Sequence, residues 1–237
     1  MKKLLTALTL ICASTSVLAD GLSPANPVLR PLTQVDGEVA LSGALAYGEE
    51  SNDDKTWNLG LNAAYGITDD FTVRLSGLSY RFLAREGNKE GLELAADVGF
   101  HGIYDTLTDN DDDTVGYGFS LQGKYVFNED LALNFGTGYT FWNGDIEQNK
   151  KEMFYSVGVQ KNIFDNLTLS ADYMYRDLRD FEQDNAYIAS IGANYNLSKN
   201  MDIGLFVAKS DFDAVKNGYQ SDHHLESAIG AYMQYRF

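Results

Sequence analysis

Apolar and polar residues alternate with a period of two along most of the chain after residue 36. Residues 57–66 show the pattern clearly. One face of this run carries Trp57, Leu59, Leu61, Ala63 and Tyr65, and the other carries Asn58, Gly60, Asn62, Ala64 and Gly66. A helix would repeat its apolar positions every 3.6 residues, so strict alternation predicts a strand whose two faces meet different surroundings.

Eleven such runs follow one another, separated by two kinds of polar break. The runs cover residues 39–47, 57–66, 71–82, 92–101, 115–125, 131–141, 153–163, 167–176, 186–197, 201–210 and 225–237. Short breaks lie at 68–70, 128–130, 165–166 and 198–200, and longer acidic breaks at 48–55, 105–113, 143–151, 177–185 and 211–223. Short turns at one end and long loops at the other are typical of transmembrane β-barrels.

The number of runs does not fit a closed barrel. A single-chain bacterial barrel has an even number of strands, so one run is misread or one strand is missed. The order of short turns and long loops breaks between Asp70 and Asn128. In the run 71–82 the alternation changes phase near Gly77, which suggests a β-bulge. The segment before residue 36 could also supply a strand. We expect an all-β, antiparallel up-and-down barrel of twelve strands, with ten as the alternative.

The composition of the polar faces distinguishes a membrane barrel from a soluble β-sandwich. A sandwich would carry Lys, Glu and Thr on its solvated faces, whereas the polar faces here are rich in Gly, Ala, Ser and Asn. Small side chains fit a crowded barrel interior. Aromatic residues also gather near strand ends, as in the interfacial girdles of membrane barrels. The pattern therefore favours apolar faces that meet lipid and polar faces that line a lumen.

The last run ends the protein with an aromatic residue. Ile229, Ala231, Met233, Tyr235 and Phe237 form its apolar face. This face resembles the assembly signal of Gram-negative outer-membrane β-barrel proteins. The resemblance implies insertion into the outer membrane, contact with its lipid and lipopolysaccharide, and recognition of Tyr235 and Phe237 by the barrel-assembly machinery. The last run must also pair with the first, because an open sheet edge is not tolerated in lipid.

The first 35 residues differ from the rest of the chain. Lys2 and Lys3 precede an apolar stretch, residues 4–13, and Ala19 ends a small-residue cleavage site, which predicts a secretory signal peptide over residues 1–19. The only cysteine, Cys12, lies inside this signal. Residues 20–35 hold all three prolines, so we expect an irregular lead-in on the periplasmic side and a barrel over residues 36–237.

The formal net charge of the 237-residue chain is −16, and the acidic excess lies in the long breaks. This charge argues against a nucleic-acid partner, because phosphate binding needs clustered Lys and Arg. The run Asp109–Asp113 lacks the Gly and Glu of an EF-hand loop, so a solvated loop is the simpler interpretation. His223 and His224, with Asp222, have no third spaced ligand. We predict no metal site and no cofactor.

Charged residues are few on the faces predicted to point inward. These pore-lining candidates are Glu38, Arg74, Arg81, Glu93, Asp97, Lys124, Asp172, Arg176, Asp202, Glu226 and Arg236. They would either line a water-filled lumen and select solutes, or pair across a narrow lumen and neutralise one another. We expect a porin-like channel for passive diffusion of small hydrophilic solutes or ions. The alternative is a closed structural barrel whose loops bind cations, lipopolysaccharide or host surfaces.

A third alternative is a barrel hydrolase. His101 and Ser120 are predicted to face inward on neighbouring runs, with Asp97 nearby, and these residue types could form a nucleophile, a base and an orienting acid. No nucleophile-elbow motif accompanies them. Three such common residues meet by chance on adjacent strands, so we do not expect an enzyme.

Overall fold

The computed structural model describes residues 22–50, 55–101, 115–143, 150–213, 217 and 225–237, with the backbone alone at 50, 88, 101, 115 and 143. The proposed signal peptide, the run Asp109–Asp113 and the group Asp222–His224 lie outside these residues.

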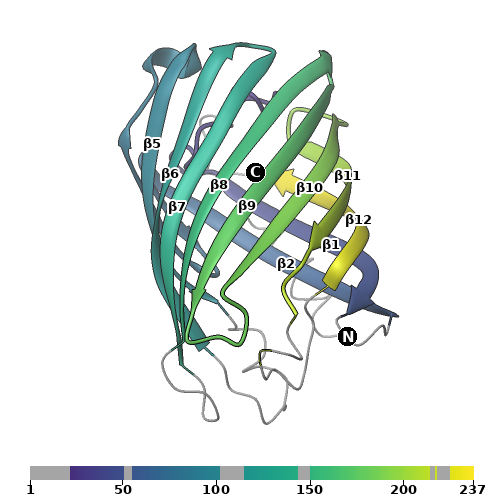
Figure 1. Ribbon diagram of the computed structural model, residues 1–237. Coiled ribbons are helices and arrows are strands. Elements are labelled where there is room, and N and C mark those ends of the chain that lie inside the picture. The colour runs from purple at the N-terminus through teal and green to yellow at the C-terminus, as the bar shows by residue number, and fades with distance from the viewer. Residues whose placement is uncertain (1–21, 51–54, 102–114, 144–149, 214–216, 218–224) are drawn as a thin grey trace, which may run out of the picture.

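Twelve antiparallel strands of the described chain close into one barrel, in the order in which they follow along the sequence (Figure 1). They are β1 (Val39–Glu50), β2 (Lys55–Thr68), β3 (Phe71–Arg74), β4 (Gly77–Leu83), β5 (Gly91–His101), β6 (Val115–Asn128), β7 (Leu131–Asn143), β8 (Lys150–Phe164), β9 (Leu167–Arg179), β10 (Asn185–Asn196), β11 (Met201–Ser210) and β12 (Leu225–Arg236). A 3-10 turn, Glu86–Asn88, joins β4 to β5. The predicted all-β barrel of twelve strands is confirmed, and the ten-strand alternative is wrong.

The first and last strands close the sheet, as predicted. β1 and β12 pair from Ala40 opposite Arg236 to Glu50 opposite Leu225. The final residue extends the ladder, because the Phe237 N–H donates to the Val39 carbonyl at 2.9 Å. Its ring meets that of Tyr235 edge-on, with 4.6 Å between centroids. The two residues of the proposed assembly signal thus lie at the seam of the barrel; their recognition during assembly stays a prediction.

The missing strand comes from the run 71–82. Its phase change is a two-residue hairpin turn at Leu75–Ser76, with Arg74 of β3 paired to Gly77 of β4, so the predicted bulge is wrong. Gly77 has a φ of +153°, and a Cβ there would lie 2.1 Å from the Val98 carbonyl oxygen. Only glycine permits this close approach of β4 to β5. The described part of the lead-in, residues 22–35, supplies no strand.

The apolar faces point outward around the whole barrel. Trp57, Leu59 and Leu205 have 65–67% of their surface exposed, and many other large apolar residues are exposed in the same way. An apolar belt of this size on a closed barrel fits lipid and not water. No helix in the described residues is long and apolar enough to cross a membrane.

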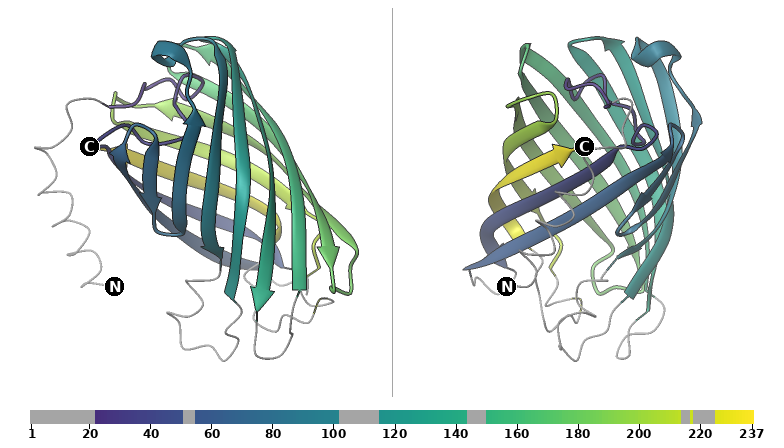
Figure 2. Two further views of the ribbon diagram at one scale, coloured as in Figure 1. Left: turned by 90° about the vertical axis from the view of Figure 1, so that its left-hand side faces the viewer. Right: turned by 180° about the vertical axis from the view of Figure 1, so that it is seen from behind.

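Residues 22–36 do not pair with the barrel wall as a strand. We call this segment the plug, because it lies inside the end of the barrel that carries the short turns (purple in Figure 2). The fully buried side chain of Val28 packs there against Val126 of β6 and Ala132 of β7. Asn26 donates a hydrogen bond to the carbonyl of Glu129, in the β6–β7 turn. The sequence predicted an irregular segment on this side, and the structure places it within the bore.

Candidate functional site: the bore

Basic side chains of the wall hold the plug by its main-chain carbonyls. The Arg236 guanidinium donates to the carbonyls of Ser23 and Pro24 at 2.9 and 3.1 Å. Lys124 donates to the carbonyls of Pro27 and Arg30 at 2.8 and 2.9 Å. An irregular segment leaves its carbonyls free of a sheet ladder, and buried carbonyls need donors. Long basic side chains on the inner face of the wall supply them.

Glu93 anchors the far end of the plug. Its side chain is completely buried and accepts a hydrogen bond from the Leu32 N–H at 2.6 Å. The Arg85 Nε lies 2.8 Å from one carboxylate oxygen, and an Arg81 nitrogen lies 3.3 Å from the other. Arg81 also pairs with Asp70 at 2.9 Å. Two guanidinium groups and an amide thus offset the cost of burying this carboxylate.

Two further carboxylates bind the plug, at Ser23 and at Arg30. Glu38, also completely buried, accepts hydrogen bonds from the Ser23 N–H and hydroxyl, both at 2.8 Å. Asp202 of β11 pairs with Arg30 of the plug at 2.7 Å. Asn196 donates at 2.6 Å to this same aspartate and to the Ala25 carbonyl. Hydrogen bonds at Ser23 and Leu32 and an ion pair at Arg30 therefore tie the plug to the wall.

Arg74 and Asp97 form a pair beside the plug. Their charged atoms are 3.6 Å apart, and Arg74 also donates to the Leu32 carbonyl at 3.0 Å. The Asp97 carboxylate accepts hydrogen bonds from Ser79 and from Ser120, the latter at 3.3 Å. Asp97 therefore contacts the nucleophile of the hypothetical hydrolase directly, whereas a triad needs it beside the base. The side chain of His101, the proposed base, lies outside the described residues.

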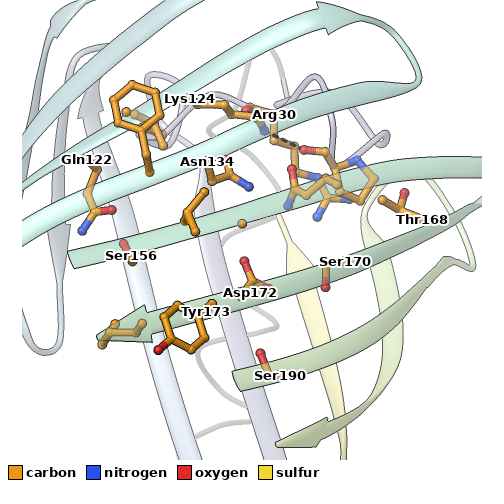
Figure 3. Close-up of a pocket in the computed structure, with 18 of the residues that line it drawn as sticks. Arg30, Gln122, Lys124, Asn134, Ser156, Thr168, Ser170, Asp172, Tyr173 and Ser190 are labelled. Atoms are coloured by element: carbon orange, nitrogen blue, oxygen red, sulfur yellow. Dashed lines mark hydrogen bonds between the residues drawn. The ribbon is translucent and has the colours of Figure 1, made fainter. Parts of the chain in front are cut away.

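A cavity of about 610 Å³ lies in the bore on the other side of the plug. Figure 3 shows Arg30 and Lys124 along one side of it and Asp172 on the strands opposite. Apolar surface, from residues such as Phe135, Met174 and Ile188, alternates in its lining with amide and hydroxyl side chains: Gln122, Asn134, Ser156, Gln160, Thr168, Ser170, Ser190, Asn194 and Gln234. The carboxylate of Asp172 makes no hydrogen bond or ion pair within the described residues, so water and solutes in the cavity can reach it.

A second group of contacts narrows the bore at the long-loop end. Arg176 of β9 makes a bidentate pair with Glu152 of β8, with both N···O distances at 2.8 Å. Its guanidinium lies 4.5 Å from the ring centroid of Phe212, which follows β11 and is buried. Lys150 donates to the carbonyl of Asn217. These contacts fold the chain after β11 over the barrel interior.

Ten of the eleven predicted pore-lining residues face the barrel interior or the plug, and the other, Glu226, lies at a bulge where β12 meets β1. Glu38, Arg81, Glu93, Lys124, Arg176, Asp202 and Arg236 are buried, and most of them bind the plug or one another. Glu226 lies near the long-loop end of β12, half-buried. Their part in solute passage stays a prediction. The sequence did not predict three charged residues of the bore: Arg30, Arg85 and Glu152. Arg30 and Arg85 lie outside the alternating runs, and Glu152 comes just before the run 153–163.

Comparison with known proteins decides the family. A family model of Gram-negative porins matches residues 32–215. The chain belongs to the Gram-negative porin family. It is therefore a porin-like channel of the outer membrane, consistent with its closed barrel and apolar belt. No curated protein matches the chain significantly.

Solved structures share the fold of this porin at low sequence identity. An outer-membrane channel of Pseudomonas putida F1 is 10% identical with a TM-score of 0.57, covering 86% of this chain and 96% of its own. The KdgM porin, solved in complex with disordered oligogalacturonate, is 10% identical with a TM-score of 0.54, covering 84% and 99%. The NanC porin is 10% identical with a TM-score of 0.53, covering 83% and 98%.

The family changes the weight of the functional alternatives. Its members are porins, which favours a channel over the hydrolase. Within the described residues, no three His, Cys, Asp or Glu side chains gather in a metal-binding arrangement.

Proposed function

We propose that this porin is a narrow diffusion channel for small hydrophilic solutes, uncharged or cationic. The cavity of about 610 Å³ beyond the plug carries this proposal. The amides and hydroxyls among its lining residues offer hydrogen bonds to a solute that has shed part of its water. Arg30 pairs with Asp202, and the Lys124 ammonium donates its hydrogen bonds to plug carbonyls. Asp172 is left as the carboxylate that faces the cavity, and it favours cations over anions.

The plug sets the size limit of this path. A twelve-stranded barrel is wider than an eight-stranded barrel, in which side chains fill the interior. It is narrower than the large porins. Here the plug occupies the short-turn end and is held there by an ion pair and by hydrogen bonds to buried carboxylates. Solutes must pass between the plug and the wall, so we expect small single-channel steps and a sharp loss of permeation with solute size.

A planar bilayer and liposome swelling test the proposal on the full mature chain. We expect discrete conductance steps, a reversal potential of cation-selective sign in a salt gradient, and swelling that is faster with a monosaccharide than with a trisaccharide. Insertion is confirmed separately by the heat-modifiable mobility of the folded barrel. Inserted protein that gives neither steps nor swelling would contradict a diffusion channel.

The second candidate is the closed barrel, which the tight anchoring of the plug favours. Deletion of residues 22–34 distinguishes the two candidates. A closed barrel would conduct only after the deletion, whereas a plugged channel conducts before it and conducts more afterwards. Binding of lipopolysaccharide or cations by the long loops would then be measured on the closed form.

A further inference from the structure

The barrel wall is interrupted beside the β3–β4 hairpin. β2 pairs with β3 only over residues 64–68, and the last bond on this side joins the Leu75 N–H to the Ala63 carbonyl. β2 nevertheless continues outward to Lys55, paired on its other side with β1. Figure 2 shows the short hairpin ending before the rim that β2 and β6 reach. Beyond the hairpin tip, no described strand stands between β2 and β5.

A cavity of about 210 Å³ lies at the tip of this hairpin. From the bore side, Arg74, Asp97, Ser120 and Thr140 line it. Leu78, Val98 and Phe100 also line it, and each of these has at least 40% of its surface exposed on the outer face. Outward-facing residues such as Val157 line the larger bore cavity as well, so it is the missing strand pairing beyond the hairpin tip that makes the wall thin at this point.

The lining defines the chemistry of a ligand. Arg74 and Asp97 neutralise each other, so the site carries no net charge. Hydroxyl groups of Ser76, Ser79 and Ser120 line its polar side. The volume is below the 300 Å³ at which pockets for drug-sized ligands begin. Such a site suits a small uncharged molecule with a hydrogen-bonding head and an apolar body, such as a short-chain or aromatic alcohol.

We propose that the β3–β4 tip is a lateral portal, which binds small uncharged amphiphiles and connects the bore with the lipid. The placement of the strands supports this independently of the cavity. An open sheet edge is tolerated at membrane depth only beside protein or a water-filled cavity. The bore provides that water at the edge of β2. Because the plug narrows the axial path, a partly apolar molecule in the bore has a shorter way out through the wall.

Single cysteines test whether both phases reach the tip, since residues 20–237 contain none. Ser76→Cys is compared with Ser190→Cys in the bore and Leu205→Cys on the lipid face. Each inserted protein reacts with a sulfonated methanethiosulfonate in water and with an alkyl methanethiosulfonate in lipid. We expect Ser76→Cys to react with both, within about tenfold of the control that each phase favours, because an open portal is reached from both sides.

Any other pattern of reactivity at Ser76→Cys would overturn the proposal of a portal. Reaction with the sulfonated reagent alone would show a tip closed to lipid, and reaction with the alkyl reagent alone would show a tip closed to the bore. Protection from both would show that another surface, such as a second copy of the chain, covers the tip. Conductance is recorded on the same samples, so that loss of the channel and loss of the portal are seen separately.

A photoreactive probe tests the ligand class. Octanol carrying a diazirine is irradiated with the inserted protein, and labelled residues are mapped by mass spectrometry. We expect labelling at Leu78, Val98 and Phe100 that excess octanol removes and octanoate removes less well. Ser120→Phe fills the cavity and should reduce this labelling at least about fivefold, whereas Ser190→Phe, in the larger cavity, should leave it unchanged. Labelling spread evenly over the apolar belt, or equal labelling in both variants, would overturn the proposal.

Discussion

Arg30 in the plug and Asp202 on β11 are 172 residues apart in sequence, yet their charged atoms lie 2.7 Å from each other. The aspartate side chain is completely buried, and the arginine side chain is 17% exposed. The Arg236 guanidinium lies 3.8 Å from the same carboxylate. One carboxylate therefore lies against two arginines where the plug meets the seam of the barrel, so we expect the position of the plug to depend strongly on Asp202.

We predict that Asp202→Asn loosens the plug and destabilises the protein. Breaking a buried pair leaves an uncompensated charge and costs about 3 kcal/mol. Unfolding in denaturant measures this loss, and larger, noisier conductance steps report the freed plug. Asp177→Asn is the control, since Asp177 pairs with Arg179 at 3.7 Å between exposed side chains. That pair should contribute less than about 1 kcal/mol. Equal losses in the two variants would contradict the special role of Asp202.

We predict opposite results for alanine at two glycines of β2. A Cβ at Gly66 would lie 2.0 Å from the Val35 carbonyl oxygen, whereas a Cβ at Gly60 meets nothing within 4 Å. Gly66→Ala must push the plug backbone away, with a loss of about 1–3 kcal/mol from overpacking. Its channel conductance should rise, while that of Gly60→Ala should stay the same or fall slightly. A plug that plays no part in the conducting path would leave both conductances alike.

The alternation of side chains made the barrel predictable. Each strand has lipid on one face and a polar interior on the other, so its side chains alternate with a period of two. Ten of the twelve strands each correspond to one alternating run of the sequence. The β3–β4 hairpin escaped because its turn, Leu75–Ser76, has none of the Asn, Asp or Pro residues that mark turns most clearly. Ser76 followed by Gly77 is a turn signal, but a bulge and a turn both explain a glycine at a change of phase.

The inward charges were predictable for the same reason, but their partners were not. Alternation places Lys124 and Arg236 on the inner face, yet both bind main-chain carbonyls of the plug. Every residue has the same main-chain carbonyl, whatever its side chain, so no sequence pattern marks such an acceptor. Arg85 was missed for a related reason: it lies after β4, where alternation has ended. The plug itself showed only as a proline-rich break in the pattern.

We predict that Arg176→Lys releases the chain after β11 from the long-loop end of the bore. Lysine cannot reproduce the bidentate pair with Glu152 or the guanidinium contact with the Phe212 ring. The loss should be about 2 kcal/mol, as for hydrogen bonds to charged groups. The Trp142 indole donates to the same glutamate at 3.3 Å, so its emission should shift as well. Arg179→Lys, at an exposed pair, is the matched control and should change neither stability nor emission.

Asp172 provides the test of ionic preference. Its carboxylate faces the large cavity, and the other charged residues of that lining, Arg30 and Lys124, are engaged with Asp202 and with the plug. In a confined bore a single fixed charge raises the local concentration of ions of opposite sign. We predict that Asp172→Asn moves the reversal potential in a salt gradient toward zero and that Asp172→Lys reverses its sign. Asp177→Asn, on the outward face of the same strand, should leave the reversal potential unchanged.

Because salt screens charges, the shift in reversal potential should shrink from 0.1 M to 1 M salt, as the Debye length falls from about 10 to about 3 Å. A reversal potential that is the same in all variants would place the selecting charge elsewhere in the bore.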